Sequence, residues 1–229
     1  MAMREAQLAR QTQNDIRREN RTSELVCSRH LRYGETMTLL LIRHGRAAAG
    51  VEELDPGLDE VGRSQAEHVA LALRDRRATR LVCSPLRRAR ETAEPIQKLL
   101  GLPLEVSEGV SEVFEASMTI GERRGLLMPL LSGRWSQQTP RLRDWRDRTL
   151  RTLAELGRDS TTIVVSHFVA ISVAIGASTE DDRVSPCALT NCSITTIEVD
   201  GDRLMLRRPG EVAHLSPEEI TATHAAMPG

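Results

Sequence analysis

The sequence has neither a long apolar run nor a cysteine motif. Its most apolar stretch, IVVSHFVAISVAIGA at 163–177, is interrupted by serines and a histidine. No run approaches the roughly 18 apolar residues of a membrane span, so we expect no membrane segment. The 4 cysteines include no CxxC pair and no spacing typical of metal ligands, which indicates reduced thiols and a cytoplasmic protein.

The sequence also lacks an excess of charge of either sign. The net charge is −1, so no overall field attracts nucleic acid or a membrane surface, and we expect neither as a partner. Lysine is nearly absent, because Lys98 is the only one and arginine supplies the other basic side chains. Arginine is the better partner for phosphate, since its planar guanidinium donates two parallel hydrogen bonds. The 229 residues suffice for one globular domain with a sizeable core.

Residues 1–36 differ in composition from the rest of the chain. The stretch MAMREAQLARQTQNDIRREN is polar, mixed in charge and almost without large apolar groups. It cannot bury enough surface to offset its ordering entropy, so we expect a disordered leader. An upstream start codon is the other interpretation, since Met37 directly precedes the first apolar run. An arginine-rich arm that binds RNA is less favoured, because acids interleave with the arginines.

From residue 37 onward, strand-like runs alternate with helix-like segments. We expect strands at TLLLI (38–42), TRLVCS (79–84), LPLEVSE (102–108) and TTIVVSH (161–167), and a hairpin at 193–208. We expect helices at 58–75, 85–101 and 144–157, with Pro95 kinking or dividing the second. The alternation predicts an α/β fold with a mostly parallel sheet covered on both faces.

Two segments fall outside this alternation. Residues 109–143 contain several Gly and Pro breaks, and so long a stretch between core elements indicates an insertion that acts as a lid over a site. Its Trp135, with Trp145 just beyond, is expected to anchor the packing. Residues 216–229 are expected to form a C-terminal tail after a domain that spans 37–215. The sequence does not fix the oligomeric state and leaves a homodimer open.

Reactive or phosphate-binding side chains follow three of the expected strands. The first strand ends in Arg43, His44 and Gly45, the second runs through Ser84 into Arg87 and Arg88, and the fourth ends in His167. Ligands of open parallel sheets bind beyond the carboxyl ends of the strands. If these strands are neighbours, two imidazoles and at least two guanidiniums share one crevice.

Such a set of side chains suits phosphoryl transfer through a phosphohistidine. A neutral imidazole is a good nucleophile near pH 7, and arginines can hold the oxygens of the transferring group bidentately. An acid must protonate the leaving alkoxide, and a nearby phosphate dianion raises the pKa of a carboxyl group, which suits a glutamic acid. No metal-ligand set is evident, and we expect neither a metal nor a cofactor.

Five motifs occur in a fixed order along the chain. They are LIRHG (41–45), LDEVGRSQA (58–66), CSPLRRARETA (83–93), SE (111–112) and VVSH (164–167). Together they resemble the histidine phosphatase superfamily, also called the phosphoglycerate mutase-like family, from residue 38 to about 215. The resemblance implies a three-layer α/β/α sandwich.

The resemblance also implies roles for five residues. His44 is expected to be the phosphorylated nucleophile and Arg43 to bind the phosphoryl group. Arg88, which precedes the alanine of the motif, carries over as a phosphate ligand, whereas Arg87 is expected to be a surface charge. His167 is expected to be the second histidine of the phosphate pocket. Glu112 aligns with the usual proton donor.

Four positions depart from the family pattern and are expected to affect the substrate. Arg46 and Ala47 follow Gly45 where many members have Glu and Thr or Ser, and Gly50 takes the place of an Asn. Arg46 either replaces the missing polar contact or faces solvent. Phe168 stands where a Gly is usual after the second histidine, so it is expected to narrow the pocket.

These observations predict a metal-independent phosphatase that hydrolyses a small phosphorylated metabolite through phospho-His44. A phosphoglycerate mutase is less favoured, because the stretch from Arg88 to His167 is short and the Ser and Asn of mutases are absent. The departures at Arg46, Gly50 and Phe168 leave open a module that binds phosphate esters without turnover. A phosphatase acting on phosphohistidine proteins is a further alternative, which a narrow, covered pocket counts against.

Overall fold

A computed structural model describes residues 37–48, 53–114 and 118–221. The leader expected at 1–36 and the departure at Gly50 lie outside these residues. The strands are β1 (Thr38–Arg43), β2 (Arg80–Cys83), β3 (Leu104–Val106), β4 (Thr162–Ser166), β5 (Ile194–Asp200) and β6 (Arg203–Glu211). The helices are α2 (Glu60–Leu73), α3 (Arg87–Leu100), α4 (Ile120–Leu131), α5 (Pro140–Leu156) and α6 (Phe168–Thr179).

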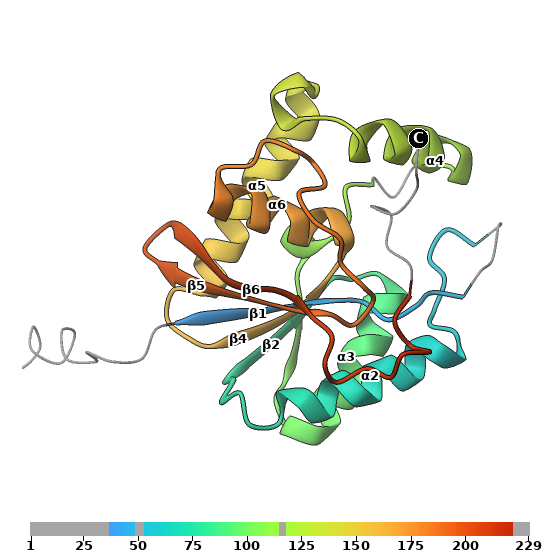
Figure 1. The fold of residues 1–229 in the computed structure, drawn as a ribbon, viewed down its shortest axis with the longest axis vertical. Helices are drawn as coiled ribbons and strands as arrows, with labels where there is room; N and C mark the ends of the chain where they lie inside the picture. Colours follow the sequence, from blue (N-terminus) through green and yellow to red (C-terminus); the bar gives the residue numbers. More distant parts are fainter. Residues whose placement is uncertain (1–36, 49–52, 115–117, 222–229) are drawn as a thin grey trace, which may run out of the picture. The chain divides into compact units, whose positions relative to one another are not determined.

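The described strands form one mixed sheet in the order β3-β2-β4-β1-β5-β6 (Figure 1). The first four strands of that order run parallel to one another, and β5 pairs antiparallel with β1 and β6. The expected α/β fold with a mostly parallel sheet is therefore confirmed. Because β2, β4 and β1 are neighbours, their carboxyl ends meet at one edge of the sheet.

Helices cover both faces of the sheet, which makes the three-layer sandwich. Leu39 and Leu41 of β1 pack into a core with α5 and α6, and Leu40 and Ile42 pack into a second core with α2 and α3. Successive side chains of a strand point to opposite faces, so a strand covered on both sides needs a continuous apolar run. This is why TLLLI shows no alternation of apolar and polar residues.

Helix ends lie where local signals predict them, with one correction. The carboxylate of Asp59 accepts a hydrogen bond from the N–H of Gly62 (2.7 Å) and caps α2. Helix α3 ends at Gly101, whose φ of 66° is in the left-handed region. Pro95 lies inside α3, and the helix continues through it, so the expected division is wrong.

Helix α6 was not expected from the sequence. Its residues from Phe168 to Gly176 are all buried, so it has no polar face and no helical periodicity of hydrophobicity. His167 is its N-cap residue and directly follows β4. The buried helix thus fixes the direction in which the chain leaves β4.

The expected lid region is more regular than the sequence suggested. Thr119 and Glu122 form a reciprocal capping box that begins α4. Helix α5 begins at Pro140, four residues before the expected helix, so 140–143 belong to it. Trp135 stacks on Trp145 with ring centroids 6.1 Å apart, which confirms both as packing anchors.

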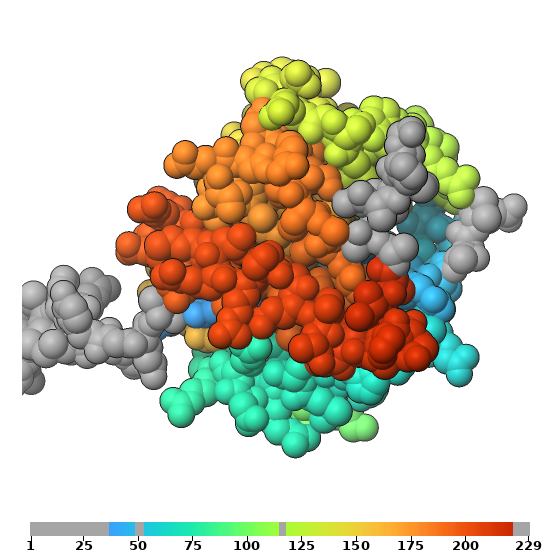
Figure 2. Space-filling model, viewed as in Figure 1, coloured from blue at the N-terminus to red at the C-terminus, as the bar shows by residue number. Residues whose placement is uncertain are grey.

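The first part of the expected C-terminal tail packs on α2 (Figures 1 and 2). The Glu219 side chain is 6% exposed and accepts hydrogen bonds from Ser64 (2.6 Å) and from the Ser216 N–H (2.9 Å). His68 also contacts this carboxylate, at 2.9 Å. Residues 216–221 are therefore part of the folded domain.

Candidate active site

The carboxyl ends of β1 and β4 bring the two expected histidines together. The ring centroids of His44 and His167 are 5.1 Å apart, and the rings are tilted by 58°. Both side chains are buried, at 9% and 0% exposed. The prediction that neighbouring strand ends share one site is therefore confirmed for these imidazoles.

The main chain of His44 is held by segments distant in sequence. Its N–H donates to the Ser166 carbonyl (2.9 Å), and its own carbonyl accepts from Nδ2 of Asn191 (2.8 Å). The Arg43 carbonyl accepts from the Cys192 N–H (2.8 Å). Sequence analysis missed Asn191, because nothing local to 189–193 indicates a contact with a loop so far away.

Gly45 lets the loop after His44 approach α2 closely. A Cβ atom built on Gly45 lies 2.6 Å from the Gly62 carbonyl oxygen, and one built on Gly62 lies 2.1 Å from the Arg46 carbonyl oxygen. No side chain larger than hydrogen fits at either position without moving the backbone. The Gly45 N–H donates to Oγ1 of Thr92 (2.9 Å), which ties the loop to α3.

Arg88 contacts both imidazoles and thereby fixes the tautomer of His44. Its Nε lies 3.2 Å from Nε2 of His44, and its Nη2 lies 3.3 Å from Nδ1 of His167. An arginine only donates, so each of these two ring nitrogens accepts. His44 therefore carries its proton on Nδ1, which lies 2.8 Å from the Gly45 carbonyl oxygen. The lone pair of Nε2 is directed toward Arg88.

His167 is oriented by the same logic. Since its Nδ1 accepts from Arg88, the neutral ring is protonated on Nε2, which lies 2.7 Å from Oγ of Ser84. Ser84 is fully buried and comes from the end of β2. Three neighbouring strands thus each contribute one side chain to a continuous hydrogen-bonded set.

Both imidazoles are held in the neutral form. Burial lowers the pKa of His44 well below its usual value, and the positive charges of Arg88 and Arg43 add to the effect. Burial, His44 and Arg88 lower the pKa of His167 in the same direction. At neutral pH His44 is therefore an unprotonated nitrogen base, as a nucleophile must be.

Arg43 is buried below the two rings. Its Nη1 donates to the Leu189 carbonyl, and its guanidinium carbon lies 5.4 Å from the centroid of the Phe168 ring. Its Nε is buried without a hydrogen-bond partner, so the side chain keeps a donor for an additional acceptor. Burial lowers the pKa of Arg43 to about 10, which leaves the group charged at neutral pH.

Glu112 lies with these groups, at the N-terminus of α6. Its carboxyl accepts hydrogen bonds from the N–H groups of Val113 (2.9 Å) and Val169. Burial raises the pKa of Glu112, although these bonds and Arg88 oppose the shift. The structure therefore brings together Arg43, His44, Arg88, Glu112 and His167, which we call the polar cluster.

Two arginines near the motifs lie outside the polar cluster. Arg46 is exposed and its Nε donates to the Asp59 carboxylate (2.5 Å), which agrees with the solvent-facing alternative considered for it. Arg87 is exposed and pairs with Glu91 (2.7 Å), as expected of a surface charge. Asp55, which sequence analysis did not single out, accepts from the Arg87 N–H (2.9 Å) and lies 3.7 Å from Arg88.

A cavity of about 260 Å³ opens above the polar cluster. Arg43, His44, Arg88, Glu112 and Asn191 form its polar wall. Ala47, Phe114, Leu127, Leu131, Phe168 and Val169 form the rest of its lining. Leu127 and Leu131 belong to α4, so the region expected to be a lid contributes side chains to this cavity.

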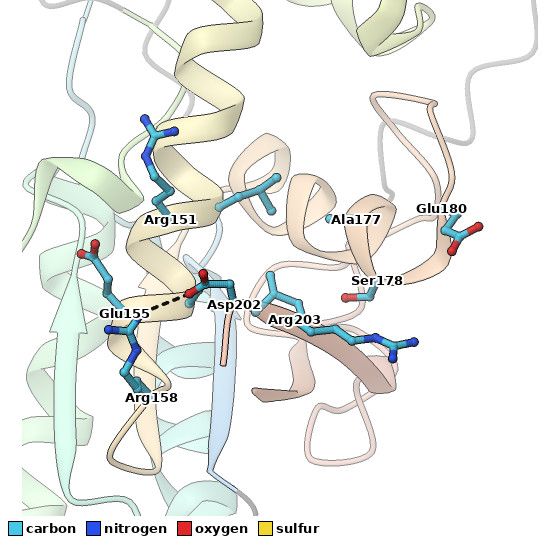
Figure 3. A pocket seen from close by; sticks show the side chains of 11 residues that line it. Arg151, Glu155, Arg158, Ala177, Ser178, Glu180, Asp202 and Arg203 are labelled. Atoms are coloured by element: carbon cyan, nitrogen blue, oxygen red, sulfur yellow. Dashed lines mark hydrogen bonds and ion pairs between the residues drawn. The ribbon is translucent and has the colours of Figure 1, made fainter. Parts of the chain in front are cut away.

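A larger cavity, of about 530 Å³, lies at the other end of the sheet (Figure 3). It is bounded by α5, the end of α6 and the β5–β6 turn, and the Arg158–Asp202 ion pair (3.1 Å) spans part of it. It contains no member of the polar cluster. The smaller cavity is therefore the candidate active site because of the residues that line it and not because of its size.

Two further features concern metals and membranes. Across 37–48, 53–114 and 118–221, no three His, Cys, Asp or Glu side chains are grouped as the ligands of a metal ion are. In the same part of the chain, no helix has the length and apolar character needed to cross a bilayer.

Comparison with known proteins agrees with this geometry. The family model of the histidine phosphatase superfamily (branch 1) matches residues 39–211. The chain therefore belongs to the histidine phosphatase superfamily, whose fold and motif residues it carries in the order expected.

Individual relatives are more distant. A probable phosphoglycerate mutase, GpmB, of Salmonella paratyphi C is 26% identical over 78% of this chain and 95% of its own. The phosphoserine phosphatase of Entamoeba histolytica, solved with 3-phosphoglyceric acid, matches with a TM-score of 0.63 and 24% identity, over 78% of this chain and 99% of its own. A mycobacterial glucosyl-3-phosphoglycerate phosphatase matches with a TM-score of 0.58 and 22% identity, over 75% and 96%. The two structures share the fold.

Proposed function

We propose that the protein is a phosphatase that hydrolyses small phosphate monoesters through a phosphohistidine on His44. One observation carries the proposal: a buried, neutral His44 with an unprotonated Nε2 lines a cavity together with Arg43, Arg88 and Glu112, and Arg88 also contacts His167. Such a wall combines a nucleophile with donors for the three oxygens of a phosphoryl group.

In the first step, Nε2 of His44 attacks the phosphorus atom and the ester P–O bond breaks. Arg43 and Arg88 donate to the phosphoryl oxygens, and His167 donates to the same group once the phosphate dianion favours its protonated form. Glu112, whose pKa is raised by burial, donates its proton to the leaving oxygen. The products of this step are an alcohol and phosphorylated His44.

In the second step, water attacks the phosphorus atom of phospho-His44. The Glu112 carboxylate takes a proton from this water, and the P–N bond breaks with its electron pair returning to Nε2. Inorganic phosphate leaves, and His44 and Glu112 are restored to their starting protonation states. No charge has to be created far from the polar cluster, since the guanidiniums of Arg43 and Arg88 are in place beforehand.

A mutase is the second candidate, because the curated relative carries that name. A mutase returns the phosphoryl group to a second hydroxyl, whereas a phosphatase transfers it to water. The covered cavity of about 260 Å³ weighs against a protein-borne phosphohistidine as substrate, since a protein surface needs an open site. A binding module without turnover predicts binding of phosphate esters and no phosphate release.

The test is phosphate release from phenyl phosphate in the presence of EDTA. We expect release by the wild type and a loss of at least about 10⁴-fold in kcat for His44→Ala. His68→Ala, which removes a histidine outside the polar cluster, is the matched control and should retain activity. Quenching the wild type with alkaline detergent should trap phosphoprotein that is stable to alkali and labile to acid.

The outcomes separate the candidates. Loss of release on adding EDTA contradicts metal independence. Activity that survives in His44→Ala contradicts the phosphohistidine. Interconversion of phosphoglycerates without net phosphate release supports the mutase.

A further inference from the structure

The cavity has two chemically different walls. Its polar wall holds the groups that contact a phosphoryl group, whereas Phe114, Leu127, Leu131 and Phe168 face the space beyond. A substrate whose phosphorus atom lies within reach of His44 must place its organic part against this second wall. The composition of that wall therefore selects the alcohol of the ester.

Among the described residues that line the cavity, the polar side chains already contact one another or the main chain near His44. Arg43 and Arg88 are directed to the Leu189 carbonyl and to the two imidazoles. The Asn191 side chain donates to the His44 carbonyl and accepts from Oγ1 of Thr221 (2.9 Å). None of these groups is directed at the organic part of a substrate.

Two of the departures from the family pattern lie in this wall. Ala47 stands where a hydroxyl residue is usual, and Phe168 stands where a glycine is usual. Each change replaces a hydroxyl or an open space by an apolar surface. Both changes therefore act in the same direction, toward a cavity that favours an uncharged alcohol.

Arg123, a further cation that contacts the lining residue Phe114, also binds a main-chain carbonyl. Its guanidinium carbon lies 5.5 Å from the centroid of the Phe114 ring, and its Nη1 donates to the Leu54 carbonyl (2.6 Å). It is not among the residues that line the cavity. A carboxylate in the cavity thus loses hydrogen bonds to water that the lining side chains cannot replace.

We propose that the substrate is the phosphate monoester of a small, uncharged, apolar alcohol or phenol, and that carboxylate-bearing esters such as phosphoglycerates are rejected. This inference rests on the proposed phosphatase function. The volume of about 260 Å³ limits the organic part to one ring or a short branched chain, since pockets for larger ligands start at about 300 Å³.

The test compares two esters of nearly the same shape. In 3-methylbutyl phosphate the chain ends in an isopropyl group, and in 2-carboxyethyl phosphate a carboxylate takes its place. We expect kcat/KM of the wild type to be at least about tenfold higher for 3-methylbutyl phosphate, because the apolar wall offers the carboxylate no partner. Phenyl phosphate, assayed alongside, shows whether the enzyme is active.

A matched pair of variants tests the wall itself. Leu127→Arg places a cation in the lining of the cavity, and Met128→Arg adds the same charge to the exposed side of the same helix. We expect Leu127→Arg to bring the two kcat/KM values within about threefold of each other or to reverse their order. Met128→Arg should keep the wild-type preference.

The results distinguish this inference from the proposed function. Equal or better turnover of 2-carboxyethyl phosphate by the wild type overturns the apolar substrate class and leaves the phosphatase intact. If Arg123→Ala selectively loses turnover of 2-carboxyethyl phosphate, then Arg123 is the cation that binds its carboxylate. This result also overturns the inference. If the wild type releases phosphate from none of the three esters, the proposed function fails and the inference with it.

Discussion

The polar cluster and the helix that covers it are built in opposite ways. Each member of the polar cluster is buried and contacts other parts of the fold, so that His44 is held by β4, by Asn191 and by Arg88. Helix α4 has a single buried residue, Leu130. Met128, two positions before it, is 52% exposed. The proposed function therefore places the chemistry where each side chain has several contacts with the fold, and the proposed substrate selection where few contacts constrain the sequence.

The largest effect is expected at Arg88, where the polar cluster depends on one geometry. Arg88→Lys keeps the charge but replaces the planar guanidinium, whose Nε and Nη2 contact His44 and His167, by a single nitrogen, so kcat/KM should fall by about 100-fold or more. Arg87→Lys changes the adjacent, exposed residue and should stay within about twofold. Steady-state kinetics of both variants measure the difference, and equal losses would contradict the assignment of Arg88.

A smaller effect is expected at Ser84, which touches no substrate. Ser84→Ala removes the partner of Nε2 of His167 and frees the ring to change tautomer, so kcat/KM should fall about tenfold. Nitrogen NMR of labelled histidine should show a mixed tautomer for His167. Ser111→Ala is the control, because its Oγ lies 3.4 Å from Ser84 and does not reach the imidazole. An unchanged tautomer in Ser84→Ala would show that Arg88 alone orients the ring.

The anchoring of α4 should affect binding more than chemistry. Leu130→Ala removes the only buried side chain of the helix, which should lower the free energy of unfolding by about 2–5 kcal/mol. Because Leu127 and Leu131 then lose their fixed position, KM should rise several-fold while kcat changes little. Met128→Ala is the exposed control. A fall in kcat that matches the rise in KM would mean that α4 also positions the reacting groups.

The smallest effect on turnover is expected at Glu219, which acts on stability. Burial opposes ionisation, but hydrogen bonds from Ser64, Ser216 and His68 lower the pKa of Glu219 from 4.5 to about 2. A carboxyl with a depressed pKa contributes stability above pH 4.5 and loses it as the pH falls toward 2. Glu219→Gln should therefore cost about 2 kcal/mol at pH 7, with a gap that narrows below pH 4.5. Urea denaturation at several pH values measures it, and Glu218→Gln should show no such gap.

Most residues of the polar cluster could be predicted from the sequence, for a physical reason. Arg43 ends β1, His44 and His167 directly follow β1 and β4, and Arg88 lies in the first turn of α3, so strand order alone was needed to bring them together. Glu112 was assigned by resemblance and lies where that resemblance implied. Asn191 and Asp55 were missed because their contacts cross long stretches of chain, and no local pattern reports such contacts.

Some helices could likewise be predicted from the sequence, and others could not. Helices with one apolar face, such as α2, were predicted from their period. Helix α6 was missed because it is buried on all sides, and α4 because its hydrophobic residues are not confined to one face. The Thr119–Glu122 capping box was the one local signal that could have marked the start of α4.

The contact between Asn191 and His44 has a consequence for synthesis on the ribosome. The two residues are 147 positions apart, so at about 5–20 residues per second the nucleophile is made roughly 7–30 s before the side chain that holds its carbonyl. The Leu189 carbonyl that binds Arg43 arrives equally late. A nascent chain therefore carries His44 without these contacts until residues 189–191 have been made.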